Sequence, residues 1–131
     1  MSNDECRMMN VEVTVKKKYD LEERLIDFSV LIINTVESLP STRAGNHLGS
    51  QLLRSGTSPA LNYGEAQSAE SKRDFIHKLG IILKELRESH VSLRILKRTG
   101  YLKDEKALNE CSELIAIFNK SIITAKRNAK P

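Results

Sequence analysis

Residues 71–102 read SKRDFIHKLGIILKELRESHVSLRILKRTGYL, and this stretch decides the fold. Its apolar positions recur in alternating steps of four and three, with one serine among them: Phe75, Leu79, Ile82, Leu86, Ser89, Leu93 and Leu96. That spacing places the whole set on one face of a long helix. We therefore predict a bundle helix over residues 71–98, ended by Gly100 in a left-handed conformation.

The same alternation continues on both sides of this stretch. Downstream, acidic residues at 104 and 105 and basic residues at 126 and 127 bound an apolar pattern that includes Cys111, so we predict an antiparallel partner helix. Upstream, Asp20 is a predicted N-cap for a helix that Pro40 ends.

The segment between these helices is unusual because small and polar residues fill most of positions 55–69. We predict a connection over residues 41–45 and then a helix, since small side chains let a neighbouring helix approach closely. Pro59 is expected to kink this helix, because it leaves the carbonyl of Ser55 without its usual donor.

Four amphipathic helices with short connections predict an all-α fold, an up-down-up-down antiparallel four-helix bundle over residues 20–127. Residues 1–19 are expected to be a flexible tail or an extended arm, in which Val11, Val13 and Val15 alternate with polar residues, and residues 128–131 a C-terminal tail.

Composition bounds the function. With 131 residues, 40% hydrophobic and 29% charged, the chain is one globular domain, not a disordered or low-complexity polymer. Cys6 and Cys111 form no disulfide framework, and no apolar run could span a bilayer, so we expect a cytoplasmic protein without membrane contact.

The two halves of the chain differ in charge. Residues 71–131 hold 14 Lys and Arg against 7 Asp and Glu, whereas residues 1–70 hold 7 Lys and Arg against 10 Asp and Glu. A basic second half favours an anionic partner such as nucleic acid, although it is equally compatible with a merely solvated face.

Motifs for catalysis, metal binding or cofactor binding are missing from the sequence. The histidines, at positions 47, 77 and 90, do not form the Glu-x-x-His pairing of di-iron bundles. Neither Arg43 with His47 nor Arg73 with His77 has the spacing that HEPN ribonucleases use. No serine stands beside a recognisable base in the sequence, and Cys111 has a core position. We therefore expect a protein that is not an enzyme and that has no metal and no cofactor.

Polar residues on the small-residue helix predict a structural network. Glu65 is expected to need a cationic partner, which Arg54 supplies, with Glu85 as a further carboxylate beside Arg54. Asn62 shares a face with Glu65 and is expected to satisfy the backbone group that Pro59 opens. A structural role is favoured over a ligand site for these four residues.

Several of these stretches together resemble a known family: QLLRS at 51–55, SPALNYGEA at 58–66, FI at 75–76, LKEL at 83–86 and TGYL at 99–102. They are similar to the four-helix-bundle proteins encoded in intervening sequences of bacterial large-subunit ribosomal RNA genes. The similarity covers residues 20–127 and extends to accessory proteins of diversity-generating retroelements. The resemblance implies a homopentamer that binds RNA or DNA and a reverse transcriptase or another protein through basic surfaces. It supplies no catalytic residues.

Two surfaces follow from helical projection. At 100° per residue, five cations fall within about 80° of one another, beside the apolar seam of the helix at 71–98: Arg73, Lys84, Arg87, Arg94 and Arg98. Four apolar residues project outside the seams and are expected to be an oligomer interface: Val30, Ile81, Val91 and Ile95. The first hypothesis is an oligomeric bundle that binds nucleic acid through the five cations and scaffolds a nucleic-acid enzyme. The alternative is a protein-interaction module whose basic face is only solvated.

Overall fold

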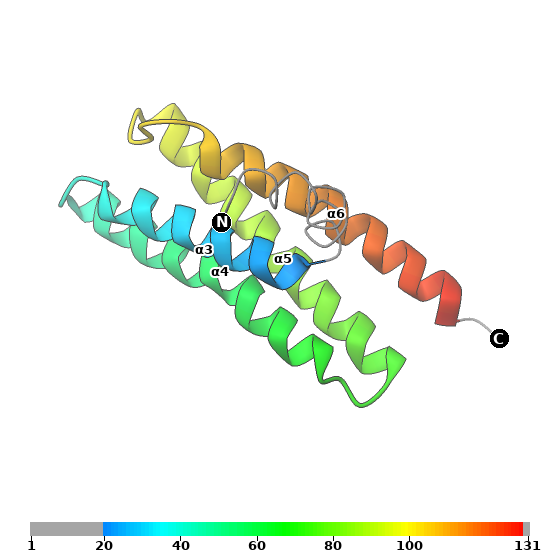
Figure 1. Ribbon diagram of the computed structural model, residues 1–131. Helices are drawn as coiled ribbons and strands as arrows, with labels where there is room; N and C mark the ends of the chain where they lie inside the picture. Colours follow the sequence, from blue (N-terminus) through cyan, green and yellow to red (C-terminus); the bar gives the residue numbers. More distant parts are fainter. Residues whose placement is uncertain (1–19, 130–131) are drawn as a thin grey trace, which may run out of the picture.

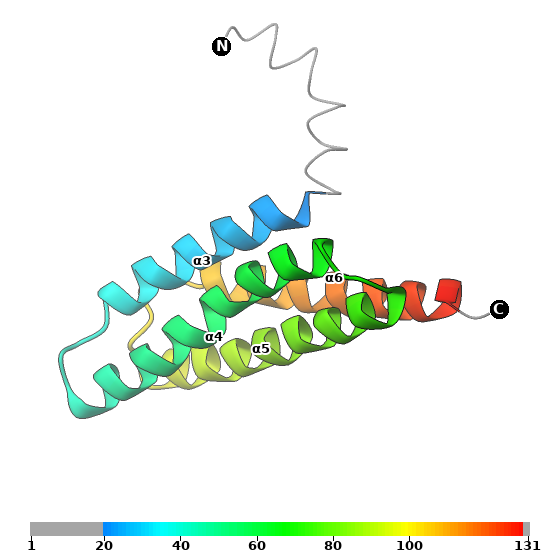
Figure 2. The ribbon, with the colours of Figure 1, turned by 90° about the horizontal axis from the view of Figure 1, so that it is seen from below.

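The computed structural model describes residues 20–129, which form four helices with short connections. They are labelled α3, Leu21–Glu37; α4, Arg43–Gln67; α5, Lys72–Arg98; and α6, Lys106–Ala129. Successive helices run in opposite directions, as Figures 1 and 2 show. The prediction of an all-α four-helix bundle is confirmed. The arm predicted at residues 1–19 lies outside the described residues, and residues 128 and 129 belong to α6 where the sequence predicted a tail.

The ends of the helices follow from local hydrogen bonds. The Asp20 side chain accepts a bond from the backbone N–H of Glu23 at 3.2 Å, which confirms the predicted N-cap. After α5, Gly100 has a φ of 80°, and the N–H of Tyr101 reaches back to the carbonyl of Leu96 at 2.9 Å. This is the left-handed cap that the sequence predicted. The connection predicted at 41–45 is wrong in extent, because the Thr42 side chain caps α4 and starts that helix at residue 43.

The bundle is built from neighbour contacts. Helix α3 packs against α4 and α6, and α5 packs against α4 and α6, so α3 and α5 lie on one diagonal and α4 and α6 on the other. Apolar side chains from all four helices form one buried core: Leu25, Phe28, Ile32, Leu52, Leu79, Ile82, Leu86, Leu93, Leu96, Ala107, Leu108, Cys111, Leu114 and Phe118. None of the helices within residues 20–129 has both the length and the apolar character needed to cross a membrane.

Helix α4 contributes small residues where its neighbours contribute large ones. A Cβ atom added at Gly56 would lie 2.6 Å from the side chain of Ile32, which shows how closely α3 and α4 approach. On the other side of α4, the buried hydroxyl of Ser89 donates a hydrogen bond to the buried Oγ of Ser55 at 2.8 Å. Pro59 is buried inside α4, and the helix continues on both sides of it. The small residues that disfavour a helix by propensity therefore let α4 fit between α3 and α5.

Gly56→Ala tests this close approach. The added methyl must displace Ile32 or separate α3 from α4, and overpacking of this kind costs about 1–3 kcal/mol of unfolding free energy. The matched control is Gly64→Ala on the same helix, where nothing lies within 4 Å of the added atom. That control should gain up to about 1 kcal/mol from helix propensity. Urea denaturation measures both, and equal stability of the two variants would contradict the packing argument.

Candidate nucleic-acid interface on helix α5

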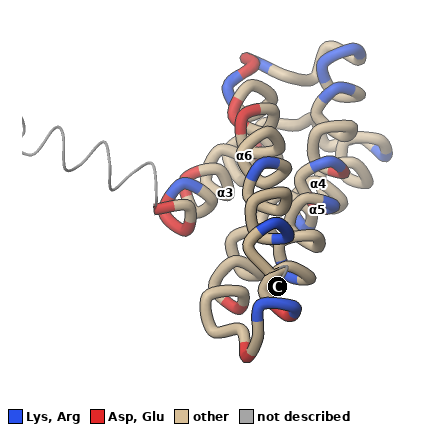
Figure 3. The backbone as a smooth tube through the Cα atoms, turned by 90° about the vertical axis from the view of Figure 1, so that its right-hand side faces the viewer, with Lys and Arg blue, Asp and Glu red and all other residues tan. Residues whose placement is uncertain are grey.

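The five predicted cations lie on one exposed face of α5. Arg73, Lys84, Arg87, Arg94 and Arg98 are all exposed, and Figure 3 shows Lys and Arg positions along both α5 and α6. We call these five residues the basic stripe. Its placement beside the apolar seam was wrong, because the buried positions of α5 are on the opposite side of the helix. From first to last residue the stripe extends over about 38 Å at 1.5 Å per residue.

No carboxylate in the described part of the chain pairs with the basic stripe. Within residues 20–129, none of its five side chains comes within 4 Å of a carboxylate. Arg87 donates a 3.3 Å hydrogen bond to the side-chain oxygen of Asn119 on α6. Glu88, the acidic residue best placed on α5 to neutralise the stripe, instead accepts a 2.6 Å bond from Arg54 on α4. The positive charge of the stripe is therefore available to an anionic partner.

Arg54 joins α4 to α5, and of its two predicted partners Glu85 is confirmed and Glu65 is wrong. Its guanidinium contacts Glu85 at 2.9 Å and Glu88 at 2.6 Å, and Glu65 takes no part. Glu65 lies 3.9 Å from Lys78. The network is also more exposed than predicted, since the Arg54 side chain is 55% accessible and only Glu85, at 14%, is largely covered. Such a pair fixes the alignment of the two helices more than it adds stability.

Asn62 also differs from its predicted role. Its side-chain amide donates to the carbonyl of Ser58 at 3.0 Å and to the hydroxyl of the same residue at 3.1 Å. Pro59 has no N–H to donate to the carbonyl of Ser55, and Ser55 lies three residues before Ser58 in the helix. The amide therefore strengthens the turn around the proline and does not repair the gap that the proline makes.

The predicted oligomer residues are exposed with one exception. Val30 is 49% accessible, Val91 50% and Ile95 42%, whereas Ile81 is half-buried. Sequence reasoning missed several further exposed apolar side chains, which are Ile26, Ile33, Leu53, Leu61 and Ile123. Those on α3 recur with the spacing of Val30, so a search for a second apolar stripe on that helix would have found them.

Val91 and Ile95 lie on the same outward face as the basic stripe. On an ideal helix they project within about 60° of Lys84 and Arg98. From the sequence, the oligomer interface and the basic stripe were predicted as separate surfaces. The structure places two of the interface residues, Val91 and Ile95, together with the stripe on the second half of α5. The stripe therefore has two parts: Arg94 and Arg98 lie beside Val91 and Ile95, whereas Arg73, Lys84 and Arg87 precede them along α5, with Arg87 one turn before Val91.

A histidine and a cysteine, residue types that often act in catalysis, lie on α5 and α6. His90 Nε2 lies 3.1 Å from the hydroxyl of Ser112 on α6, a Ser–His contact that the sequence did not show, but the Ser112 hydroxyl also donates to the carbonyl of Leu108. Cys111 is buried among core residues, as predicted, and desolvation followed by the nearby Glu110 raises its pKa to about 12. Its thiol stays protonated and unreactive at neutral pH. Among residues 20–129, no three His, Cys, Asp or Glu side chains gather closely enough to hold a metal ion.

The fold and this face together define an all-α four-helix bundle with an exposed cationic helix. Residues 17–122 match the family described as 23S rRNA-intervening sequence protein, so the chain belongs to that family. A solved structure from Bacteroides thetaiotaomicron VPI-5482, of a protein of unknown function from the S23 ribosomal protein family, is similar at 35% identity. The match covers 77% of this chain and 96% of that one, with a TM-score of 0.72. No curated protein matches the chain in sequence.

His90 predicts how stability depends on pH. Desolvation, with a smaller contribution from the positive charge of Arg94, lowers its pKa below the usual value. The unfolded chain therefore binds a proton here more readily than the folded chain, and stability is lost as pH falls through the usual His pKa toward the lowered one. His90→Gln should show a smaller loss of unfolding free energy between pH 7 and pH 5 than the parent. An identical pH dependence, measured by urea denaturation, would refute this role.

Proposed function

We propose that the protein is a non-enzymatic, oligomeric bundle that binds RNA or DNA through the basic stripe and scaffolds a nucleic-acid enzyme. One observation carries the proposal: five cations follow a single exposed face of α5, and no carboxylate within residues 20–129 pairs with them. Charge of one sign along a rod of about 38 Å attracts a polyanion that runs along it.

The chemistry of the stripe favours phosphates over bases. Phe75, the only Phe, Tyr or Trp of α5, packs against the core, so none of these large aromatic rings stands among the cations to stack on a base. Lys and Arg contacts to the backbone supply affinity without reading sequence. Each such contact releases counterions, and three to five of them should lower the affinity about 40- to 500-fold between 50 and 200 mM salt.

The oligomer part of the proposal uses two different faces of the bundle. The outer face of α3 carries Ile26, Val30 and Ile33 next to exposed acidic residues at 23 and 27, whereas the second half of α5 carries Val91 and Ile95 next to Arg94 and Arg98. These faces match in apolar character and are opposite in charge. Because they lie on different helices, they would join copies head to tail, and such contacts form a ring when the rotation between successive copies closes. The number of five copies comes from the family resemblance.

This arrangement divides the basic stripe between two tasks. The second half of α5 would be covered by the α3 face of the next subunit, and Arg73, Lys84 and Arg87 would remain free for phosphates. Each subunit then offers a short cationic segment, and a ring repeats it, so weak contacts add up to useful avidity.

A protein-interaction module is the second candidate. The overlap of Val91 and Ile95 with the stripe favours it, since an acidic, apolar surface of a partner protein such as a reverse transcriptase would fit the same face. The two candidates differ in whether the isolated protein binds nucleic acid at low salt.

The nucleic-acid proposal predicts the effect of charge reversal. Lys84→Glu combined with Arg87→Glu should reduce binding of labelled RNA and DNA at least tenfold at 50 mM salt, because two phosphate contacts become repulsive. The matched control is Arg43→Glu with Lys103→Glu, which changes the net charge equally at exposed positions outside α5. Fluorescence anisotropy measures the affinity. Equal losses in both variants, or no binding by the parent at low salt, would leave the protein-interaction candidate in front.

The oligomer proposal predicts a complementation experiment. Val30→Glu and Val91→Glu each remove one of the two faces, so each variant alone should be monomeric, whereas a mixture should form dimers through the one intact pair of faces. Ala116→Glu, at an exposed position on α6, should keep the mass of the parent assembly. Light scattering at micromolar concentration measures the masses. A monomeric parent, or two variants that retain the parent mass, would refute the head-to-tail arrangement.

A further inference from the structure

Helix α3 is much shorter than the helices it packs with. It has 17 residues, whereas α4, α5 and α6 have 25, 27 and 24, so α3 rises about 25 Å and the others about 36 to 40 Å. In Figures 1 and 2, the C-terminal end of α6 extends beyond the first turn of α3. About two turns of the bundle at this end therefore have three helices where the rest has four.

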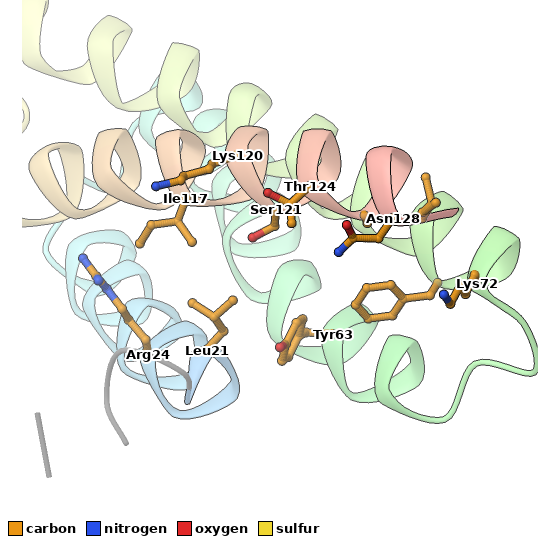
Figure 4. A pocket seen from close by; sticks show the side chains of 12 residues that line it. Leu21, Arg24, Tyr63, Lys72, Ile117, Lys120, Ser121, Thr124 and Asn128 are labelled. Carbon is orange, nitrogen blue, oxygen red and sulfur yellow. The ribbon is translucent and has the colours of Figure 1, made fainter. Parts of the chain in front are cut away.

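An open cavity of about 700 Å³ occupies the place of the missing turns. Figure 4 shows Leu21 of α3 and Ile117 and Ser121 of α6 facing this space, with Tyr63 of α4 beside it. We call it the end groove. Its lining is mainly apolar and comes from all four helices: Leu21, Tyr63, Phe75, Ile76, Ile117 and Ala125. A groove of this size and character leaves apolar surface in water unless a further segment covers it.

Tyr63, in the wall of the end groove, packs against a buried aromatic ring of the core. The ring of Tyr63 meets that of Phe118 edge to face at a centroid distance of 5.9 Å, and burial, followed by the charges of Asp20 and Glu22, raises the pKa of its hydroxyl. The acidic start of α3 therefore lies close to one side of the groove. Lys72 and Lys120 contribute positive charge to the other walls.

We propose that the end groove binds residues 11–15 of the same chain. The segment that precedes Leu21 enters the bundle at the groove itself, because Leu21 is part of the lining. Val11, Val13 and Val15 alternate with polar residues, so in an extended conformation all three side chains point to one side, toward the apolar floor. The segment then takes the place of the turns that α3 lacks.

Length and charge agree with this occupant. The part of α6 that lines the groove, from Ile117 to Asn128, is about 16 Å long, and five extended residues span about 13 Å. The residues between 15 and 21 reach up to about 20 Å, which allows the chain to turn back over the groove. Lys16, Lys17 and Lys18 would lie beside the acidic start of α3.

A disulfide trap in the full-length chain tests the proposal. On a Cys6→Ser and Cys111→Ala background, Val13→Cys is combined with Ser121→Cys, and the folded protein is oxidised. An intramolecular disulfide should form in most molecules and give a monomer band of altered mobility on a non-reducing gel. The control pairs Val13→Cys with His47→Cys, an exposed position near the start of α4 at the other end of the bundle, where no disulfide is expected. Covalent dimers in place of a cross-linked monomer, or equal trapping in the control, would overturn the proposal.

Hydrogen exchange gives a second measurement without cysteines. Replacing Val11, Val13 and Val15 by Asp in the full-length chain should speed amide exchange at residues 117–128 at least severalfold, and leave the amides of α4 around Gly56 unchanged. Circular dichroism checks that the variant is folded. Unchanged exchange at 117–128 would overturn the proposal. Neither measurement involves nucleic acid, so the result is independent of the proposed function.

Discussion

The bundle depends on the close approach of α4 to both of its neighbours. Gly56 leaves no room for a side chain against Ile32 of α3, and the buried hydroxyls of Ser55 and Ser89 meet at 2.8 Å between α4 and α5. These two contacts come from adjacent residues, so they fix the position of α4 along both helices at the same level. A shift by one turn would put a side chain where only a hydrogen atom fits and would leave a buried hydroxyl without its partner. The large apolar residues of α3, α5 and α6 can form one core because this alignment is set.

Much of this fold could be predicted from the sequence, because apolar spacing by threes and fours is a local signal. The long helices at 72–98 and 106–129 follow it closely, and the cap at Gly100 follows from a residue that tolerates positive φ. Helix α4 was predictable only by arguing that small residues permit close packing, which its propensity alone contradicts. Of the partners of Arg54, Glu85 was predicted from the sequence, but the choice of Glu88 over Glu65 was not, since it depends on how α4 and α5 align.

The candidate site, too, was only partly predictable from the sequence. Helical projection identified which cations share a face, but they were placed on the wrong side relative to the seam. The same projection, applied to Val91 and Ile95, would have shown that these two residues lie among the cations. The opposite charges of the two halves of the chain become, in the folded molecule, an acidic face on α3 and a basic face on α5. These helices lie on one diagonal of the bundle and do not touch, so the charges are not neutralised inside one molecule. A surface that combines apolar and charged residues in this way suits a partner, whether that partner is another copy or a polyanion.

The connectivity of the bundle also has a consequence for the order in which it folds. Three of its four helix contacts join helices that follow one another in the chain, and each needs only a short loop to close. The contact of α3 with α6 is different, because it includes the pair of Arg24 with Glu110, whose residues are 86 positions apart. Closing so long a loop costs more conformational entropy than closing a hairpin. We expect the three hairpins to form early in folding and the seam between α3 and α6 to close last and to open first.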